Sequence, residues 1–177
     1  KQFIGEGSNS VVYKCHHAET GETVALKEPR CPGASLSQEA RKHAKKLTGL
    51  HHENIVAHRR VCPDGAIIMD FVEGGSLLDL LRRCGGRLEE DQTATIARHI
   101  VKGVAYLHSQ GVIHKDIKPS NILYDSRNKI AKIGDLALAA QGRLESRSGV
   151  RFPCGTPSFL AAEVVRNGIH IPASDIW

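Results

Sequence analysis

Residues 114–121 carry the side chains whose types and spacing could do chemistry. Asp116 is followed two positions later by Lys118 and three further on by Asn121, and a second carboxylate, Asp135, stands fourteen positions beyond Asn121. In this order they supply an acceptor for a hydroxyl proton, a cation that neutralises phosphate charge, and two oxygen ligands for Mg²⁺. The pattern predicts transfer of a phosphoryl group from ATP to a hydroxyl.

A second constellation lies near the N-terminus. Gly5 and Gly7 stand between two apolar runs typical of strands, and Ser10 takes the place of a third glycine in a loop whose N–H groups could cover phosphates. Lys27 ends the next strand-like run and would present its charge beneath that loop. Each feature alone is weak, because glycines make turns and lysines cap strands. Their order favours a site for nucleotide phosphates.

Elements that could position these residues can be read from the apolar pattern. Short apolar runs at residues 11–13, 23–26 and 66–69 predict strands, with a hairpin turn at residues 19–22 and a helix over residues 37–50. After a break at residues 73–76, helical spacing dominates at residues 77–83 and 89–109. The fold class is therefore α+β, with a small β-rich lobe at residues 1–72 and a mainly helical lobe at residues 73–177.

In their order, these motifs resemble those of eukaryotic protein kinases, over nearly the whole chain. Lys118 and the Gly155-Thr156-Pro157 segment are similar to the serine/threonine-specific branch, and the loop at residues 114–121 resembles kinases of signalling cascades such as MAP kinase kinase kinases. The resemblance implies a two-lobed fold, ATP and Mg²⁺ as cofactors, and transfer of the γ-phosphoryl group to Ser or Thr of a protein substrate. It also implies a large lobe that continues beyond Trp177, so the chain is expected to be truncated there.

The resemblance assigns a role to individual positions. Val12 and Ala25 would lie above adenine and Leu123 below it, with Met69 as gatekeeper and the hinge at residues 70–73. Grouped by role, the implied residues are Asp116, Lys118 and Lys27 for catalysis; Asn121 and Asp135 for the metal; Gly5, Gly7, Ser10, Val12, Ala25, Lys27, Met69, Asp70, Val72 and Leu123 for ATP; and Glu163 and Asp175 as structural anchors.

Regulatory positions depart from the family's pattern. Lys115 stands where the family has an arginine, and Phe152 stands at the usual phosphorylation site, where it offers no hydroxyl. The two changes predict that control through that position is weakened or absent. Three serines nearby stay candidates for modification: Ser146, Ser148 and Ser158.

Two other departures bear on activity. Glu39 is the candidate ion-pair partner of Lys27, but counting back from residues 52–55 puts His43 at the family's position, so both assignments stay open. Ala137 replaces a glycine that would follow Asp135 and Leu136. These changes motivate an alternative, a kinase-fold pseudoenzyme that binds nucleotide or acts as a scaffold. Phosphorylation of a small molecule fits less well, because residues 155–157 and 161–163 resemble a peptide-positioning segment.

Composition narrows the partners. The formal net charge is +5, but the basic residues are spread along the chain, which disfavours a nucleic-acid partner. An apolar run long enough for a membrane span and the core of a signal peptide are both missing, so we expect no membrane partner and a cytoplasmic location, with the nucleus left open. The five scattered cysteines predict reduced thiols, and Cys154 is expected to be an inert apolar filler. No upstream regulator is indicated.

Overall fold

The structure is a computed structural model that describes residues 1–7, 10–30, 45–136, 139–141 and 154–177. The chain divides into two compact units. The first consists of Lys1–His52 and Val56–Val72, and the second consists of Glu53–Ile55 and Glu73–Trp177. The predicted boundary between residues 72 and 73 stays a prediction. In this division the unit changes between Val72 and Glu73, and the short segment Glu53–Ile55 also belongs to the second unit.

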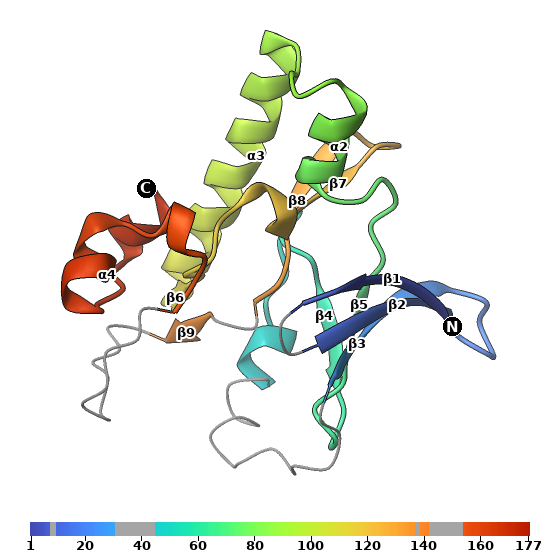
Figure 1. Cartoon of the computed structure of the whole chain (residues 1–177). Coiled ribbons are helices and arrows are strands. Elements are labelled where there is room, and N and C mark those ends of the chain that lie inside the picture. The colour runs from blue at the N-terminus through green and yellow to red at the C-terminus, as the bar shows by residue number, and fades with distance from the viewer. Residues whose placement is uncertain (8–9, 31–44, 137–138, 142–153) are drawn as a thin grey trace. The chain divides into compact units, whose positions relative to one another are not determined.

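The first unit is built on a five-stranded antiparallel sheet (Figure 1). The predicted strands at residues 11–13 and 23–26 are confirmed within β2 and β3, and the one at residues 66–69 is confirmed by β5, which begins one residue later at Ile67; the spatial order is β1-β2-β3-β5-β4. The strands are β1 (Gln2–Glu6), β2 (Ser10–His16), β3 (Thr23–Pro29), β4 (His58–Val61) and β5 (Ile67–Asp70).

The hairpin between β2 and β3 forms where the turn signal at residues 19–22 predicts it. The His17 N–H donates to the Glu22 carbonyl oxygen at 2.8 Å, and Gly21 adopts a φ of 69°, a conformation that glycine takes without steric cost. Of the predicted helix at residues 37–50, residues 45–48 are helical. Residues 31–44, with the candidates Glu39 and His43, lie outside the described part of the chain.

The second unit contains the two predicted helices. Helix α2 (Leu77–Arg83) begins with a capping box, in which the Ser76 Oγ accepts from the Asp79 N–H and the Asp79 carboxylate accepts from the Ser76 N–H. Helix α3 (Glu90–Ser109) begins one residue after the predicted start because Glu89 is its N-cap. The predicted apolar stripe of α3 buries Ile96, Val104 and Leu107, with Ile100 half-buried.

Helix α3 lies close to β8 (Ile130–Ile133), and Gly103 permits the approach. A Cβ at Gly103 would lie 2.8 Å from the Asn54 carbonyl oxygen and 2.9 Å from Cδ1 of Ile133. Asn54 is tied to the same strand, since its Nδ2 donates to the Ala131 carbonyl oxygen at 3.0 Å and its backbone carbonyl oxygen accepts from the Ile133 N–H at 2.8 Å. These contacts explain why Glu53–Ile55 belongs to the second unit.

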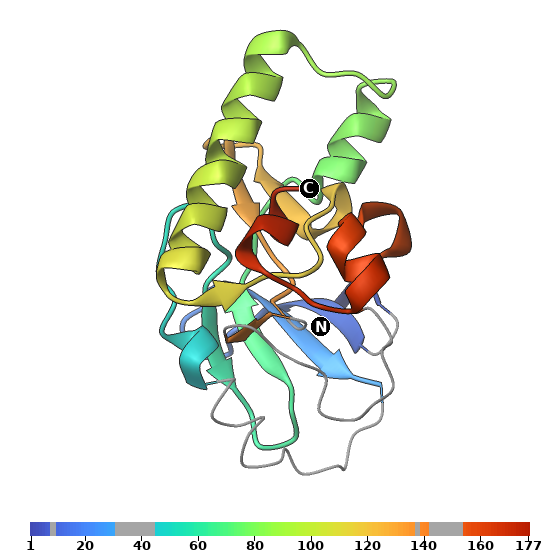
Figure 2. The same ribbon diagram turned by 90° about the vertical axis from the view of Figure 1, so that its left-hand side faces the viewer.

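The remaining elements of this unit are short and follow α3 along the chain (Figure 2). Strands β6 and β9 pair with each other, and β7 pairs with β8. Within the described residues, no helix is long and apolar enough to span a bilayer. The elements are β6 (Val112–Ile113), η1 (Pro119–Asn121), β7 (Ile122–Asp125), β9 (Ala140–Gln141), η2 (Pro157–Phe159), α4 (Ala162–Asn167) and η3 (Pro172–Asp175).

Candidate active site

The loop after β6 is held from inside by His114, which is fully buried. Its Nδ1 accepts from the Asp116 N–H at 3.2 Å, so the ring proton belongs on Nε2, which lies 2.9 Å from the Gly134 carbonyl oxygen. The imidazole thereby links the backbone at Asp116 to the residue before Asp135. Two segments that the sequence singled out for chemistry are joined by one side chain.

A second support comes from Asp175 on η3, whose side chain is buried. Its carboxylate accepts from the backbone N–H groups of His114 and Lys115, both at 2.8 Å, and its Oδ2 lies 2.8 Å from Nε2 of His108. Lys115 has a φ of 74°, an uncommon conformation for a residue with a Cβ. The two backbone hydrogen bonds hold the loop in this conformation at the residue before Asp116.

Asp116 is the centre of a closed polar network. Its Oδ1 accepts from the Thr156 hydroxyl at 2.6 Å, and its Oδ2 lies 2.7 Å from Nζ of Lys118 and accepts from Nδ2 of Asn121 at 2.9 Å. Nζ of Lys118 also donates to Thr156 Oγ1 at 2.5 Å. The structure thus brings Asp116, Lys118 and Asn121 together, and adds Thr156.

These hydrogen bonds set the charge state of Asp116. Burial opposes its ionisation, but hydrogen bonds from Lys118, Thr156 and Asn121 outweigh the burial and hold the pKa of this carboxyl below its ordinary value. Asp116 is therefore an ionised acceptor at neutral pH. Only 11% of its side chain is exposed, so the carboxylate is oriented by its neighbours rather than by bulk water.

Thr156 was named by the sequence only as part of a motif, and its role is a geometric finding. The preceding Gly155 has a φ of 114°, and a Cβ there would lie 2.7 Å from the Lys115 carbonyl oxygen and 2.8 Å from Cδ2 of Leu160. Only glycine allows the chain to lie this close to the loop. This close packing places the Thr156 hydroxyl within hydrogen-bond distance of the Asp116 carboxylate.

Asn121 and Asp135 are the candidate metal ligands, and the backbone joins their segments. The Gly134 N–H donates to the Asn121 carbonyl oxygen at 2.8 Å, and the next residue, Asp135, is exposed with a φ of 51°. Because Nδ2 of Asn121 donates to Asp116, the atom that its side chain can offer to a cation is Oδ1.

In the part of the chain that the structure describes, protein side chains alone do not form a complete metal site. Among the described ranges, no group of three or more His, Cys, Asp or Glu side chains is arranged to hold a metal ion. One carboxylate and one amide oxygen are instead what Mg²⁺ uses when phosphate oxygens and water complete its octahedron. The donor set fits Mg²⁺ that arrives with a nucleotide.

Four of the predicted ATP positions of the first unit, Val12, Ala25, Lys27 and Met69, share one face of its sheet. Val12 pairs with Lys27 across β2 and β3, and Ala25 pairs with Met69 across β3 and β5. Directly opposed residues, and residues two apart on one strand, point to the same side. Gly5 is opposite Val12 on β1, so the glycine segment borders the same face. Three apolar side chains and one lysine therefore line it.

The remaining predicted ATP positions lie in both units. In the first unit, the Gly7 N–H donates to the Ser10 oxygen at 2.8 Å, and Asp70 forms an ion pair with Arg59 at 2.6 Å. Val72 is buried in the same unit. In the second unit, Leu123 on β7 pairs with Lys132 on β8.

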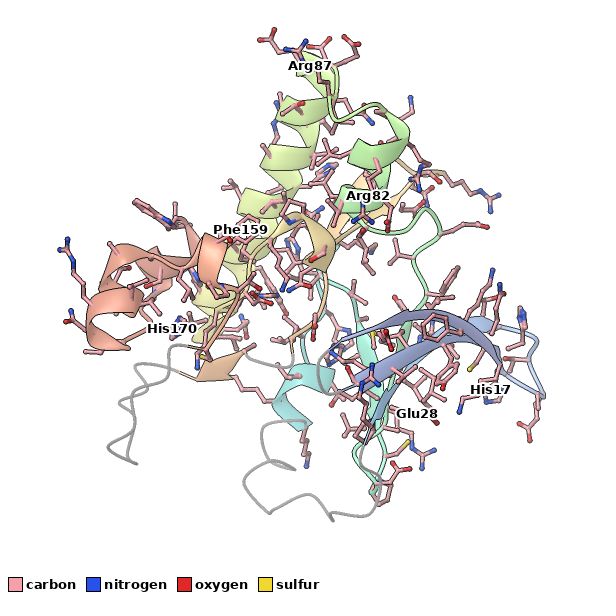
Figure 3. All side chains as sticks on the ribbon, viewed as in Figure 1. His17, Glu28, Arg82, Arg87, Phe159 and His170 are labelled. Carbon is pink, nitrogen blue, oxygen red and sulfur yellow. The ribbon has the colours of Figure 1, made fainter. Side chains whose placement is uncertain are left out.

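The predicted structural anchor Glu163 and the candidate modification site Ser158 both lie in the second unit. Glu163, at the start of α4, accepts from the Ser174 hydroxyl at 2.7 Å, and this hydrogen bond lowers the pKa of its carboxyl. Ser158 lies on η2, whose exposed residue Phe159 is labelled in Figure 3. The predictions for Ala137, Ser146, Ser148 and Phe152 fall outside the described residues.

Comparison with known proteins extends over the same residues. The family described as "Protein kinase domain" matches residues 1–177. CBL-interacting serine/threonine-protein kinase 15 of Arabidopsis thaliana is 32% identical over 99% of this chain and 43% of its own length. Mitogen-activated protein kinase kinase kinase 3 of Mus musculus is 34% identical over 99% of this chain and 30% of its own length.

A third relative carries a different kinase name. Serine/threonine-protein kinase PAK mbt of Drosophila melanogaster is 34% identical over 98% of this chain and 27% of its own length. The chain therefore spans less than half the length of these relatives, and the similarity extends across both compact units.

Proposed function

The chain belongs to the protein kinase domain family, and from this premise we propose that it transfers the γ-phosphoryl group of ATP to Ser or Thr hydroxyls of a protein substrate. The observation that carries the proposal is the network of Asp116, Lys118, Thr156 and Asn121. It offers an ionised acceptor beside a cation, which is the arrangement that attack by a hydroxyl on a phosphoryl group needs. The names of two of these relatives, CBL-interacting serine/threonine-protein kinase 15 and serine/threonine-protein kinase PAK mbt, support the choice of Ser and Thr.

Each member of the network has a distinct task. Asp116 orients the substrate hydroxyl and accepts its proton as the oxygen attacks. Lys118, whose ammonium lies 2.7 Å from Asp116 Oδ2, places positive charge where the transferred group becomes most anionic. The Thr156 hydroxyl touches both charged groups and fixes their separation. Its task is positioning.

Two cofactors fit the residues present. When bound, Mg²⁺ and ATP supply the transferable phosphoryl group and the cation that screens its charge. Asn121 and Asp135 would hold the metal, since their segments are joined through Gly134. Lys27 would bind the phosphates, and the apolar residues on its face of the sheet would cover the adenine.

The compartment follows from thiol chemistry and is also a proposal. Cys15, Cys62, Cys84 and Cys154 carry free thiols, which suits a reducing environment. We therefore retain the cytoplasm as the place of action.

Phosphate incorporation into a generic basic protein tests the proposal. The full-length protein, with Mg²⁺ and ATP, is compared with Asp116→Asn and with Lys27→Met. Loss of the proton acceptor should lower turnover by about 10²- to 10⁴-fold, while Asp116→Asn keeps its affinity for ATP. Lys27→Met should weaken both nucleotide binding and turnover. If the wild-type protein binds ATP but all three proteins show only background turnover, the chain is a nucleotide-binding scaffold and the proposal is wrong.

A further inference from the structure

The chain leaves the sheet of the first unit at the end of β5, and Asp70, Phe71 and Val72 are the last residues of that unit. We call these three residues the β5 exit segment. Phe71 and Val72 lie in neither a strand nor a helix, and no described residue is a hydrogen-bond partner of their backbone N–H and carbonyl groups. Val72 is nevertheless buried. Since the backbone groups of buried residues are normally paired, a ligand is the expected partner.

A cation holds the first residue of the β5 exit segment. Nε of Arg59, on β4, donates to Oδ1 of Asp70 at 2.6 Å, and its Nη1 lies 2.7 Å from Oε2 of Glu22 in the β2–β3 hairpin. The hydrogen bond from Arg59 lowers the pKa of the Glu22 carboxyl, so Glu22 is ionised at neutral pH. One planar guanidinium therefore joins the exit segment to the hairpin at two fixed points.

A second cation holds the next residue of the segment. Nζ of Lys14, on β2, lies 4.5 Å from the centre of the Phe71 ring, within the range of a cation–π contact. Lys14 is directly opposite Ala25 across β2 and β3. Asp70 is directly opposite Val24, the neighbour of Ala25 on β3. Neighbouring residues of a strand point to opposite faces, so the two cations reach the exit segment from opposite faces of the sheet.

These contacts differ from an isolated surface ion pair, which contributes little to the stability of a protein. Arg59 bridges two carboxylates that are far apart in the sequence, and only 37% of its side chain is exposed. Lys14 adds a contact on the adjacent residue of the same segment. A segment without regular structure is thereby ordered before any ligand arrives. A ligand that binds an ordered segment does not lose affinity to the entropy of ordering it.

We propose that Arg59 and Lys14 are positioning residues for the base of the bound nucleotide. They hold the β5 exit segment in one conformation, so that its unpaired backbone groups can bind the polar edge of adenine. Lys27, by contrast, would bind the phosphates, so the two contributions to nucleotide affinity can be measured separately. The assignment rests on the proposed kinase function in one respect, which is that the ligand of this site is an adenine nucleotide.

Affinities for adenosine and for ADP test the role of Arg59. Both ligands are titrated calorimetrically into the full-length protein in the presence of Mg²⁺. Arg59→Met removes the guanidinium and keeps an unbranched apolar stem. We expect this variant to bind both ligands more weakly by the same factor, about 3- to 10-fold, because both ligands carry the base. Lys27→Met should weaken the binding of ADP alone, since adenosine has no phosphate.

Arg60 supplies the matched control. It follows Arg59 on β4, is exposed, and makes no ion pair within the described residues. Arg60→Met should therefore leave both affinities unchanged. Arg59→Lys keeps the charge but cannot bridge two carboxylates with a planar fork, so it should recover only part of the loss. In the active enzyme, Arg59→Met should raise the KM for ATP by the same factor and leave kcat unchanged, because the reacting groups are untouched.

A double-mutant cycle tests the contact between Lys14 and Phe71. Lys14→Met and Phe71→Leu each remove one partner, and each should weaken adenosine binding by about 2- to 5-fold. If the two side chains act only through each other, the double variant should bind adenosine no more weakly than either single variant. Full multiplication of the two losses would show that they act independently, and Lys14 would then not be a positioning residue.

Two results would overturn the role of Arg59. A folded Arg59→Met variant could lose no more affinity for adenosine than Arg60→Met loses. It could also lose affinity for ADP but not for adenosine, which would place the effect at the phosphates instead of the base. Thermal melts establish that each variant is folded at the temperature of the titration.

The titrations measure binding and not turnover, so failure of this inference can be told from failure of the proposed function. A wild-type protein that binds adenosine and ADP but transfers no phosphoryl group would refute the proposed reaction, and the comparison of Arg59→Met with Arg60→Met would still decide the role of Arg59. A wild-type protein that phosphorylates its substrate, with equal KM values for ATP in these two variants, would refute the inference and leave the proposed function standing.

Discussion

The most informative perturbation of this site is Thr156→Val, which keeps the shape of the side chain and removes its hydroxyl. The hydroxyl donates to Asp116 at 2.6 Å and accepts from Lys118 at 2.5 Å. Lys118 keeps its 2.7 Å contact with Asp116 in the variant, so the loss that matters is the hydrogen bond to the carboxylate. A hydrogen bond to a charged group contributes about 1.5–3 kcal/mol. If that energy orients the acceptor, kcat/KM should fall about 10- to 150-fold.

The pH profile separates this effect from simple misfolding. The hydroxyl of Thr156 is one of the groups that lower the pKa of Asp116. Its removal raises that pKa, while Lys118 and Asn121 still favour the carboxylate. Asp116 must be ionised to accept a proton, so the acid limb of kcat/KM should move to higher pH. A merely unstable variant would lose activity at every pH without moving the limb.

Steady-state phosphate incorporation from pH 3 to 8 is the assay, because the acid limb of Asp116 lies near or below its ordinary pKa of 3.8, with Thr156→Ser as the matched control. Serine restores the hydroxyl and should keep at least about a third of the wild-type kcat/KM, since it loses only a methyl group. The reasoning is refuted if Thr156→Val stays within twofold of the wild-type protein, or if its acid limb does not move.

Two further predictions concern stability. Gly74→Ala should lower the free energy of unfolding by at least about 2 kcal/mol, because Gly74 has a φ of 128° and a Cβ there would lie 2.2 Å from the Tyr124 oxygen; in chemical denaturation, Gly85→Ala, with a φ of 67° and nothing within 4 Å, is the control, and equal losses would contradict the argument. Thermal melts from pH 6 to pH 3 should show stability falling below about pH 4, because the lowered pKa of Asp116 stabilises the fold above its ordinary value of 3.8 and this contribution is lost as pH falls through the folded-state value. Asp116→Asn should flatten that decline, and an equally steep decline in the variant would assign it to other carboxylates.

Much of the fold could be predicted because local patterns dominate it. The α+β fold class and the family resemblance are confirmed by the match over the whole chain. Helices α2 and α3 follow from helical spacing, and the β2–β3 hairpin follows from its turn residues. The assignment of Glu53–Ile55 to the second unit could not be predicted, because it depends on the fit of Gly103 against Asn54 and Ile133.

The site was predictable in its chemistry and less so in its supports. Asp116, Lys118 and Asn121 are close in the sequence, so their spacing alone suggested a common centre. Thr156 lies 40 residues from Asp116, and the contact depends on the missing side chain at Gly155. Close approach and burial arise only in the folded chain, from residues that are far apart in the sequence, so no local sequence pattern predicts them.

The position of Asp175 has a consequence for how the protein is made. Its carboxylate holds the backbone of Lys115, which lies 60 residues earlier in the chain. At a synthesis rate of about 5–20 residues per second, a ribosome needs roughly 3–12 s to travel that distance. During that interval the nascent loop has left the decoding centre but lacks the carboxylate that supports its left-handed residue. We therefore expect a newborn chain to acquire its reactive geometry late, after most of its secondary structure can already form.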